Sequence, residues 1–362
     1  MASWGGKSDP YMQDNPSVIE SSEDIPGRDC ANCGRPAMEE EHPTLLCREC
    51  REMFTRFPIP LWIKAFAGGV GVLLLFSLIT LPKNLSIGIH LERGERAEKQ
   101  KKYLTAGQEL KKVLEKVPDN AEAEGHLLVC SFYNQDFETF SDMVKRLQHV
   151  NIEDKDLLER VNGVFDKASA YISNDSFENF KNSHPALGQL ADSAWEGYFI
   201  RNPADSYAAM EYTNLLMGRK EYHRCDSILQ SVLARDPEYY PALAFEISLK
   251  REENDLDGAL NSSRKMLAIN HESAFGEASE VRTLLRQKKD QQALDLALKC
   301  YERNDKSPYI LSTLILAYHF NGRTGDRDVM IKKAQAAASD SSAKIQVQYA
   351  LDVIAKKEKF RD

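Results

Sequence analysis

The pattern of hydrophobic and polar positions divides the chain into three parts. Residues 1–29 show no apolar periodicity and are rich in Ser, Asp, Gly and Pro, a composition typical of disorder. One apolar run follows, from Leu61 to Leu81. From about Glu95 to Asp362, apolar residues recur at helical spacing, and glycine and proline fall mostly at turns. The sequence therefore predicts an all-α C-terminal domain.

The apolar run has the properties of a membrane span. Its twenty-one residues would form a helix of roughly 32 Å, enough to cross the hydrocarbon core. Pro60 and Pro82 flank it, Trp62 stands where an interfacial aromatic belongs, and Lys64 is close enough to the end to snorkel. A buried core helix is disfavoured because no face of the run is polar. We expect a single transmembrane helix at 61–81, and no separate signal peptide precedes it.

Small residues in this run bear on oligomeric state. Ala65 with Gly69 and Ala67 with Gly71 form small-x-x-x-small pairs, which would allow two helices to approach closely. Glycine is also common in membrane helices generally. A homo-oligomer therefore stays open.

The C-terminal domain contains a regular period. Small residues stand at equal intervals in helical patterns, at Ala191, Cys225, Ala259 and Ala293. Pro203 and Pro237 have the same spacing, each at the end of a predicted helix. This interval of about 34 residues, together with the residues that mark it, resembles the tetratricopeptide repeat (TPR). The resemblance implies antiparallel helix pairs stacked into a solenoid over 95–362.

Other segments fit this resemblance less regularly. Ala106, Leu110 and Val113 suit the second helix of an early repeat, and His184 to Pro203 suits another, with Ala191, Trp195 and Tyr198. Asp154 to Asn182 is longer than one helix and interrupts the period. The turns Asn254-Asp255 and Lys289-Asp290 separate helices, and Ala343 to Lys359 is expected to cap the solenoid.

Two Cys-x-x-Cys pairs precede the apolar run, Cys30 with Cys33 and Cys47 with Cys50. Two such turns supply the four thiolates of a tetrahedral structural zinc site, and Gly34 suits the positive φ of a tight knuckle. The second pair is expected to run directly into a helix. Residues 30–52 thus resemble a zinc ribbon. A redox dithiol, or His42 in place of one cysteine, is the alternative.

Composition limits the function further. The net charge of −8 argues against general nucleic-acid binding, because phosphate neutralisation needs a basic face. No nucleophile elbow, phosphate-binding glycine loop or His-Glu-x-x-His motif occurs, and the histidines are scattered, so we do not expect an enzyme. Cys130, Cys225 and Cys300 are far apart and are expected to be buried thiols.

We expect the solenoid to bind protein partners or peptides on its concave face. The resemblance places five candidate partner-binding residues there: Tyr207, Met210, Asn214, Phe245 and Phe275. Packing between adjacent helices is the alternative role for each. The carboxylate clamp of some family members is not supported, because Met210 and Phe245 replace the lysine and asparagine that it needs.

The leading hypothesis is a membrane-anchored scaffold, in a process such as envelope assembly or secretion. The alternative makes the zinc ribbon a nucleic-acid-binding or regulatory sensor, coupled across the membrane to the solenoid. Arg35, Arg48 and Arg51 lie near the knuckles and would serve it, but Glu39 to Glu41 offset them.

The positive charges on the two sides of the apolar run are nearly balanced and do not decide its orientation. We therefore predict the topology from the chemistry of the cysteines. Zinc thiolates persist best in a reducing cytosol, so we expect a cytoplasmic N-terminus and an extracytoplasmic solenoid, although three lone cysteines favour the opposite. The plan is similar to bacterial membrane-tethered TPR proteins with a rubredoxin-like zinc module. In those proteins the module follows the repeats, whereas here it precedes the span.

Overall fold

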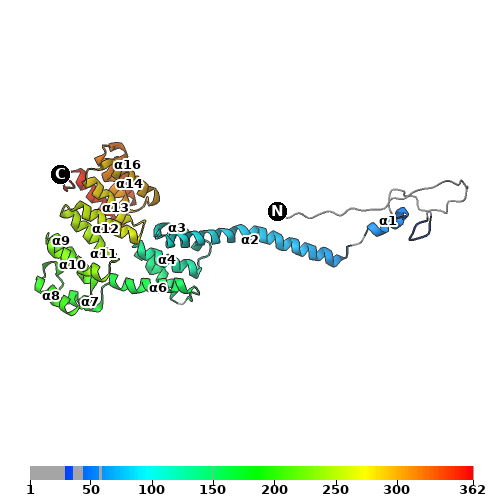
Figure 1. Cartoon of the computed structure of the whole chain (residues 1–362), viewed down its shortest axis with the longest axis horizontal. Coiled ribbons are helices and arrows are strands. Elements are labelled where there is room, and N and C mark those ends of the chain that lie inside the picture. The colour runs from blue at the N-terminus through cyan, green and yellow to red at the C-terminus, as the bar shows by residue number, and fades with distance from the viewer. Residues whose placement is uncertain (1–28, 36–43, 57–58, 149, 362) are drawn as a thin grey trace, which may run out of the picture. The chain divides into compact units, whose positions relative to one another are not determined.

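The computed structural model describes residues 29–35, 44–56, 59–148 and 150–361, with the side chains of 78–84 excepted. The predicted disordered tail and His42 therefore lie outside the described residues. The chain divides into two units, residues 1–79 and residues 80–362. Figure 1 labels the helices of both units. The described part of the chain is almost entirely helical, which confirms the all-α prediction.

The α-helices, in chain order, are α1 (Arg48–Thr55), α2 (Leu61–Lys99), α3 (Tyr103–Leu114), α4 (Ala121–Tyr133), α5 (Phe137–Leu147), α6 (Lys155–Ala168), α7 (Asp175–Ser183), α8 (Asp192–Arg201), α9 (Ser206–Gly218), α10 (Tyr222–Arg235), α11 (Tyr240–Glu252), α12 (Leu256–Ile269), α13 (Ala274–Arg286), α14 (Asp290–Arg303), α15 (Pro308–Phe320), α16 (Thr324–Ala337) and α17 (Ser341–Ile354). Two 3-10 turns, Ser169–Tyr171 and Leu187–Gln189, flank α7.

The helices from α9 to α16 repeat with the predicted period. The first helices of the four pairs begin at Ser206, Tyr240, Ala274 and Pro308, and the second helices at Tyr222, Leu256, Asp290 and Thr324. Helix pairs of this period are the architecture of a TPR-like solenoid. Cys225, Ala259 and Ala293 are fully buried in the second helices, where a small side chain lets the paired helix approach.

Ala191 does not belong to this series. It is exposed and is the N-cap of α8, and none of the residues from His184 to Ala191 is α-helical. The predicted helix over 184–203 is therefore shorter, and only Trp195 and Tyr198 are buried. Between Phe180 and Asp192 the chain turns through a 3-10 segment, so the match in spacing at Ala191 is coincidental.

Residues with positive φ form a second series with the same period, and they mark the end of the first helix in each pair. Seven residues with positive φ follow helices: Lys101, Gln135, Lys220, Asn254, Lys288, Gly322 and Lys356. After α11 the amides of Asn254 and Asp255 donate to the carbonyls of Arg251 and Lys250 at 3.1 and 2.8 Å. This is the Schellman ending, which satisfies two helix carbonyls. The first two members are one period apart, and so are successive members among the last five, so the period includes α2 to α5.

The series is broken in the middle of the solenoid. Gln135 and Lys220 are separated by two and a half periods rather than a whole number. The predicted interruption at 154–182 is confirmed, because α6, a 3-10 turn and α7 occupy it. An aromatic cluster lies in this part of the chain. Phe177, Trp195 and Tyr198 are its most buried members, with Phe180 beside them.

This break folds the solenoid back on itself. The turn between α12 and α13 contacts the first two pairs: His271 donates its amide to the Lys101 carbonyl at 2.9 Å, and the Asn270 side chain donates to the Tyr133 carbonyl at 3.0 Å. Glu272 accepts from the amide and hydroxyl of Thr105 at 2.8 and 2.7 Å. The repeats thus form two arrays that touch, rather than one open spiral. The first array comprises α2 to α6, and the C-terminal array comprises α9 to α17.

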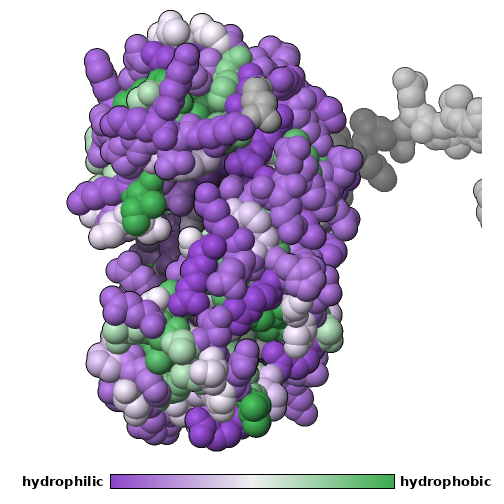
Figure 2. All heavy atoms as spheres, turned by 90° about the vertical axis from the view of Figure 1, so that its left-hand side faces the viewer, coloured by the Kyte–Doolittle hydropathy of each residue, from purple (hydrophilic) through white to green (hydrophobic). Residues whose placement is uncertain are grey.

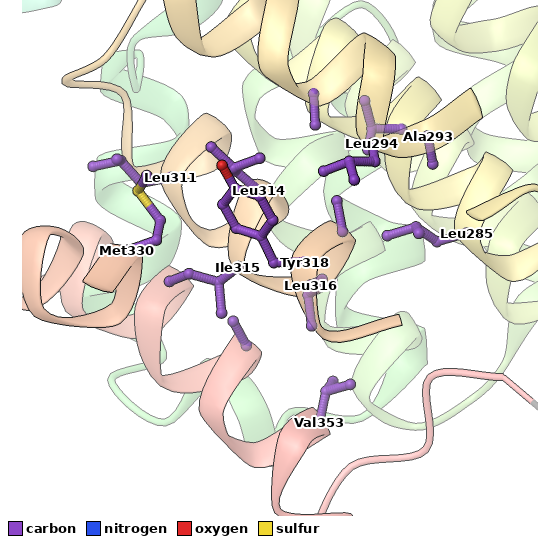
Figure 3. Close-up of a cluster of buried hydrophobic side chains, with 14 of the residues drawn as sticks. Leu285, Ala293, Leu294, Leu311, Leu314, Ile315, Leu316, Tyr318, Met330 and Val353 are labelled. Atoms are coloured by element: carbon purple, nitrogen blue, oxygen red, sulfur yellow. The ribbon is translucent and has the colours of Figure 1, made fainter. Parts of the chain in front are cut away.

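The C-terminal array ends in an apolar core that joins α13, α14, α15, α16 and α17 (Figure 3). Leu314, Ile315 and Leu316 of α15 are fully buried, and Val353 of α17 packs against the same cluster. The predicted cap is confirmed as α17, although the helix ends at Ile354. Phe360 then returns to the core, where its ring stacks on Phe320 at 5.1 Å.

Helix α2 is longer than predicted. It continues past Leu81 and through position 82 to Lys99, so the expected stop at Pro82 is wrong. Ile87 and Leu91 pack against the core of the first array, so the solenoid begins before the predicted Glu95. Among the residues whose side chains are described, no helix meets the length and hydropathy needed for a membrane span, and positions 78–81 of the predicted span lie outside that set.

Candidate metal centre and partner-binding face

The four cysteines of the paired motif converge. The sulfurs of Cys30, Cys33, Cys47 and Cys50 all lie within 4.8 Å of one another, and those of Cys33 and Cys47 are 3.6 Å apart. Four thiolates about 2.3 Å from one tetrahedral ion would have sulfurs separated by roughly 3.8 Å. The cluster therefore has the dimensions of a single four-sulfur metal site.

Local sequence builds this geometry. Gly34 has φ of 67°, which confirms its predicted role, and its amide donates to the Cys30 carbonyl at 2.9 Å. Cys47 is the N-cap of α1, so the second pair does run into a helix. Backbone amides, that of Cys47 first, lower the pKa of the Cys30 thiol to about 6. Such donors favour the thiolate, which is the form that binds metal.

The described residues of the module offer little else to hold it together. Its buried cluster consists of Cys30 and Cys50, with Leu46 and Cys47 packed against them. A segment of this size cannot fold on apolar burial alone. The donor set and the small core both fit a bound metal ion, and all four positions would be filled by protein groups.

The arginines beside the module are largely engaged by acidic neighbours. Arg35 pairs with Glu49 at 3.3 Å and Arg48 pairs with Glu52 at 3.4 Å, both on the surface. Arg51 donates to the Thr44 carbonyl. These contacts reduce the basic surface that the nucleic-acid alternative requires.

The five predicted partner-binding residues occupy different environments. Met210 is buried, and Tyr207 and Phe245 are half-buried against the same aromatic cluster, where Tyr207 meets Phe177 at 5.9 Å. Asn214 is exposed. Phe275 is half-buried and lies apart from the other four. Their role in partner binding remains a prediction.

Phe275 belongs to a row of aromatic rings. Its centroid is 6.4 Å from that of Tyr240 and 5.3 Å from that of Tyr309. The three residues occupy the first turns of α11, α13 and α15, so the row follows the repeat from one pair to the next. It lines one wall of a cleft of about 660 Å³. The opposite wall carries polar side chains of the first array: Gln108, Lys111, Ser131 and Asn134.

Buried polar groups were not apparent from the sequence. His126 is only 1% exposed, and its Nδ1 lies 2.5 Å from Glu98, whose other oxygen pairs with Arg160. Nothing in the sequence pattern sets His126 apart from the other scattered histidines. The three residues come from α2, α4 and α6, and no local motif links them.

The three lone cysteines are fully buried, as predicted. Burial raises the pKa of Cys225 to about 11 and that of Cys300 to about 12. Both thiols are therefore protonated at neutral pH and act as small apolar side chains.

Comparisons with known proteins assign no family to the chain. No family model matches the chain, and no curated protein matches its sequence. Among solved structures, a TPR protein from Parabacteroides merdae is 11% identical, with a TM-score of 0.37, over 74% of this chain and 99% of that one. Yeast Tom70 is 12% identical, with a TM-score of 0.36, over 70% of this chain and 62% of that one. The P58(IPK) TPR domain is 12% identical, with a TM-score of 0.23, over 83% of this chain and 98% of that one. Such scores transfer no partner or activity to this chain.

Proposed function

We propose that this chain is a membrane-anchored scaffold whose TPR-like solenoid binds protein partners. The observation that carries the proposal is the cleft between the two arrays, with its row of Tyr240, Phe275 and Tyr309. Aromatic side chains in a partly buried row supply large contact area at a small cost in conformational entropy. The facing amides and hydroxyls offer hydrogen bonds to a peptide backbone. An extended segment of a partner, for example in envelope assembly or secretion, fits this combination.

The anchor is proposed on the first part of α2. Between residues 61 and 77 the only charged residue is Lys64, and large apolar side chains are exposed on every face. Leu61, Trp62 and Phe66 are 84%, 69% and 69% exposed, and residues 72–76 are each at least 60% exposed. A helix that is apolar all round is either a core helix or a membrane helix. Contact with lipid would remove this surface from water.

The cysteine module is proposed to hold structural zinc. Ligation by four sulfurs leaves no position for substrate, so the ion would stabilise the module rather than catalyse a reaction. A site of this kind keeps its thiolates best in the cytosol. The proposed topology therefore has the module inside and the solenoid outside. Protease protection in intact cells would test it: cleavage of the solenoid and protection of the module are expected, and the reverse pattern would rule the topology out.

The test of partner binding uses a matched pair of variants. Phe275→Ala removes the central ring of the cleft, and Phe165→Ala removes a 39% exposed phenylalanine that does not line it. Photo-crosslinking from position 104, in the cleft wall, would identify the bound proteins in cells expressing the full chain. We expect Phe275→Ala to weaken capture about 30-fold, the loss of a binding hot spot worth about 2 kcal/mol. Equal capture by both variants would contradict the proposal.

A further inference from the structure

A second cavity, of about 460 Å³, lies on the first helices of the C-terminal array. It is lined by residues of α9, α11, α13 and α17, together with Lys220, Tyr222 and Phe360. Four of its side chains are cationic, Lys220, Arg251, Arg282 and Arg286, and Glu252 is the single acidic residue in its wall. A chain with net charge −8 thus concentrates positive charge at one place. Figure 2 shows a recess across the middle of the face that carries α8, α9 and the C-terminus.

Arg282 is the most deeply buried of these cations, at 9% exposed. Its Nε donates to the Thr313 hydroxyl and its Nη2 to the Ser312 hydroxyl, both at 2.8 Å. Nη2 also lies 3.2 Å from the Gln346 side-chain oxygen. Neutral oxygens orient the guanidinium, and among the described residues no carboxylate pairs with it. Its Nη1 is left for a further acceptor.

The two neighbouring arginines have one carboxylate near them, and only Arg286 pairs with it. Arg286 pairs with Glu252 at 3.2 Å and also donates to the Arg251 carbonyl. Arg251 itself has only a long contact of 3.4 Å with the Ser248 hydroxyl within the described part of the chain. Burial, reinforced by repulsion from Arg282 and Arg286, lowers the pKa of Arg251 to about 10. Burial likewise lowers the pKa of Arg282.

This arrangement costs stability unless something neutralises it. Buried charges that lack a counter-charge are strongly unfavourable, and like charges in one cavity add repulsion. A cluster required only for folding would gain from a second carboxylate in the wall. The hydroxyl and amide contacts instead hold Arg282 in place while leaving its charge free to act on a ligand.

We propose that this cavity binds a phosphorylated residue of a protein partner, an inference that rests on the proposed scaffold function. Arg251 and Arg282, which no carboxylate of the described residues neutralises, call for about two negative charges. A phosphoryl group carries about −1.5 to −2 at pH 7 and three acceptor oxygens, whereas a carboxylate carries one charge. Arginine is well suited to such groups because it donates two parallel hydrogen bonds.

The other walls favour a partner segment over free phosphate. Met217, Tyr222, Tyr349 and the 65% exposed Ile345 surround the cationic centre and offer contacts to residues beside the phosphoryl group. The ring of Tyr349 also lies over the Arg282 guanidinium at 5.4 Å. The cavity therefore offers both cationic and apolar contacts, which matches a charged side chain within a peptide.

The test uses the full-length chain in detergent and three fluorescent pools of degenerate nonapeptides. Their central residue is phosphoserine, serine or aspartate, and binding is measured by fluorescence anisotropy. We expect the phosphoserine pool to bind at least 10-fold more tightly than the other two. Arg251→Gln and Arg282→Gln should abolish this preference. Arg264→Gln, which removes an exposed charge outside the cavity, should retain it.

Thermal melting separates a binding role from a folding role. Without peptide, Arg251→Gln should melt at the same temperature as the wild type or higher, because it relieves repulsion. A phosphoserine preference that survives in a folded Arg251→Gln variant would overturn the site. Equal binding of the aspartate pool would overturn the phosphoryl assignment. Competition by inorganic phosphate as strong as that by the phosphopeptide pool would overturn the assignment to a partner segment.

The same measurements distinguish this inference from the scaffold function. If the pools show no phosphoserine preference while Phe275→Ala still lowers crosslinking in cells, the phosphoryl site fails and the scaffold stands. If Phe275→Ala captures the same proteins as Phe165→Ala, the scaffold function fails, and this inference rests on it.

Discussion

Individual residues in this chain take their roles from their surroundings rather than from their type. Seven cysteines illustrate this. Four have sulfurs within 4.8 Å of one another in a module that has almost no other core. The remaining three are fully buried among apolar side chains of the solenoid. Spacing in the sequence separated the two groups correctly, because a metal knuckle is a local structure.

Replacing one cysteine of each group should have opposite effects. Cys33→Ser removes a ligand, so we expect most zinc to be lost to a mild chelator while the melting temperature of the solenoid is unchanged. Cys130→Ser should leave the zinc content unchanged and lower the melting temperature, because it buries a hydroxyl at a site of 0% exposure, at a cost of about 1–3 kcal/mol. Metal analysis and calorimetry of the two variants check this. Zinc retained by Cys33→Ser would contradict the assignment of the ligands.

Glu277 should make the stability of the C-terminal array depend on pH. The residue is 6% exposed, and burial raises its pKa to about 7, although Arg303 opposes the shift. Because the folded state then holds the proton more tightly than the unfolded state, stability falls as pH rises from about 4.5 to 7. The fall attributable to this group is about 3 kcal/mol. Denaturant melts of Glu277→Gln at several pH values should show a flatter profile than the wild type, and an unchanged slope would exclude this carboxyl as the cause.

At the scale of the elements, the helix endings repeat with the period but leave little trace of it in the sequence. Each Schellman ending requires a positive φ, yet Lys or Gln occupies it at five of the seven positions. A non-glycine residue there costs roughly 1 kcal/mol, which packing of the helix pair offsets. In the sequence, the repeat period is therefore marked by the buried small residues and scarcely by glycine. Because small residues are common, one of them, Ala191, could match the period by chance.

Glycine at one of these endings should stabilise the chain. Lys288 has φ of 59°, so Lys288→Gly relieves strain and should raise stability by about 0.5–1 kcal/mol. Lys289→Gly, one residue later at φ of −89°, is the matched control. It should lower stability because it only adds freedom to the unfolded chain. Chemical denaturation measures both, and a loss of stability in Lys288→Gly would contradict the proposed strain.

At the scale of the whole solenoid, the fold-back was the part that the sequence did not reveal. Its hydrogen bonds join residues 136 to 170 positions apart, the longest being that between His271 and Lys101. Asn270 and Glu272 are polar residues of an inter-helix turn, and nothing in their local pattern distinguishes them from solvent-exposed ones. The same limit applies to the arginine cavity, whose lining residues extend from Met217 to Phe360. Local motifs predicted the cluster of four cysteines and the helix pairs, whereas sites assembled from distant turns were missed.

Breaking the contact between the arrays should loosen them without unfolding either one. Glu272→Ala removes both acceptors of Thr105, and Asp257→Ala, in the neighbouring α12, is an exposed control. We expect faster amide hydrogen exchange at residues 101–105 and 270–273, with exchange in α15 unchanged. Mass spectrometry of the exchanged chain checks this. Uniformly faster exchange would instead indicate global destabilisation.

The turns that meet the first array also constrain how such a chain can change in length. The turn at Glu238 and Tyr239 reaches Lys167 and Ala170, and the equivalent turn of the next helix pair reaches Thr105 and Tyr133. Duplication or loss of one helix pair between α9 and α12 would shift the later turns by one repeat. A turn without Asn270 and Glu272 would then lie opposite Lys101. Pairs beyond α14 are free of this restriction. During evolution, repeats should therefore be gained and lost near the C-terminal end of the solenoid, while the number between Lys101 and Ser273 stays fixed.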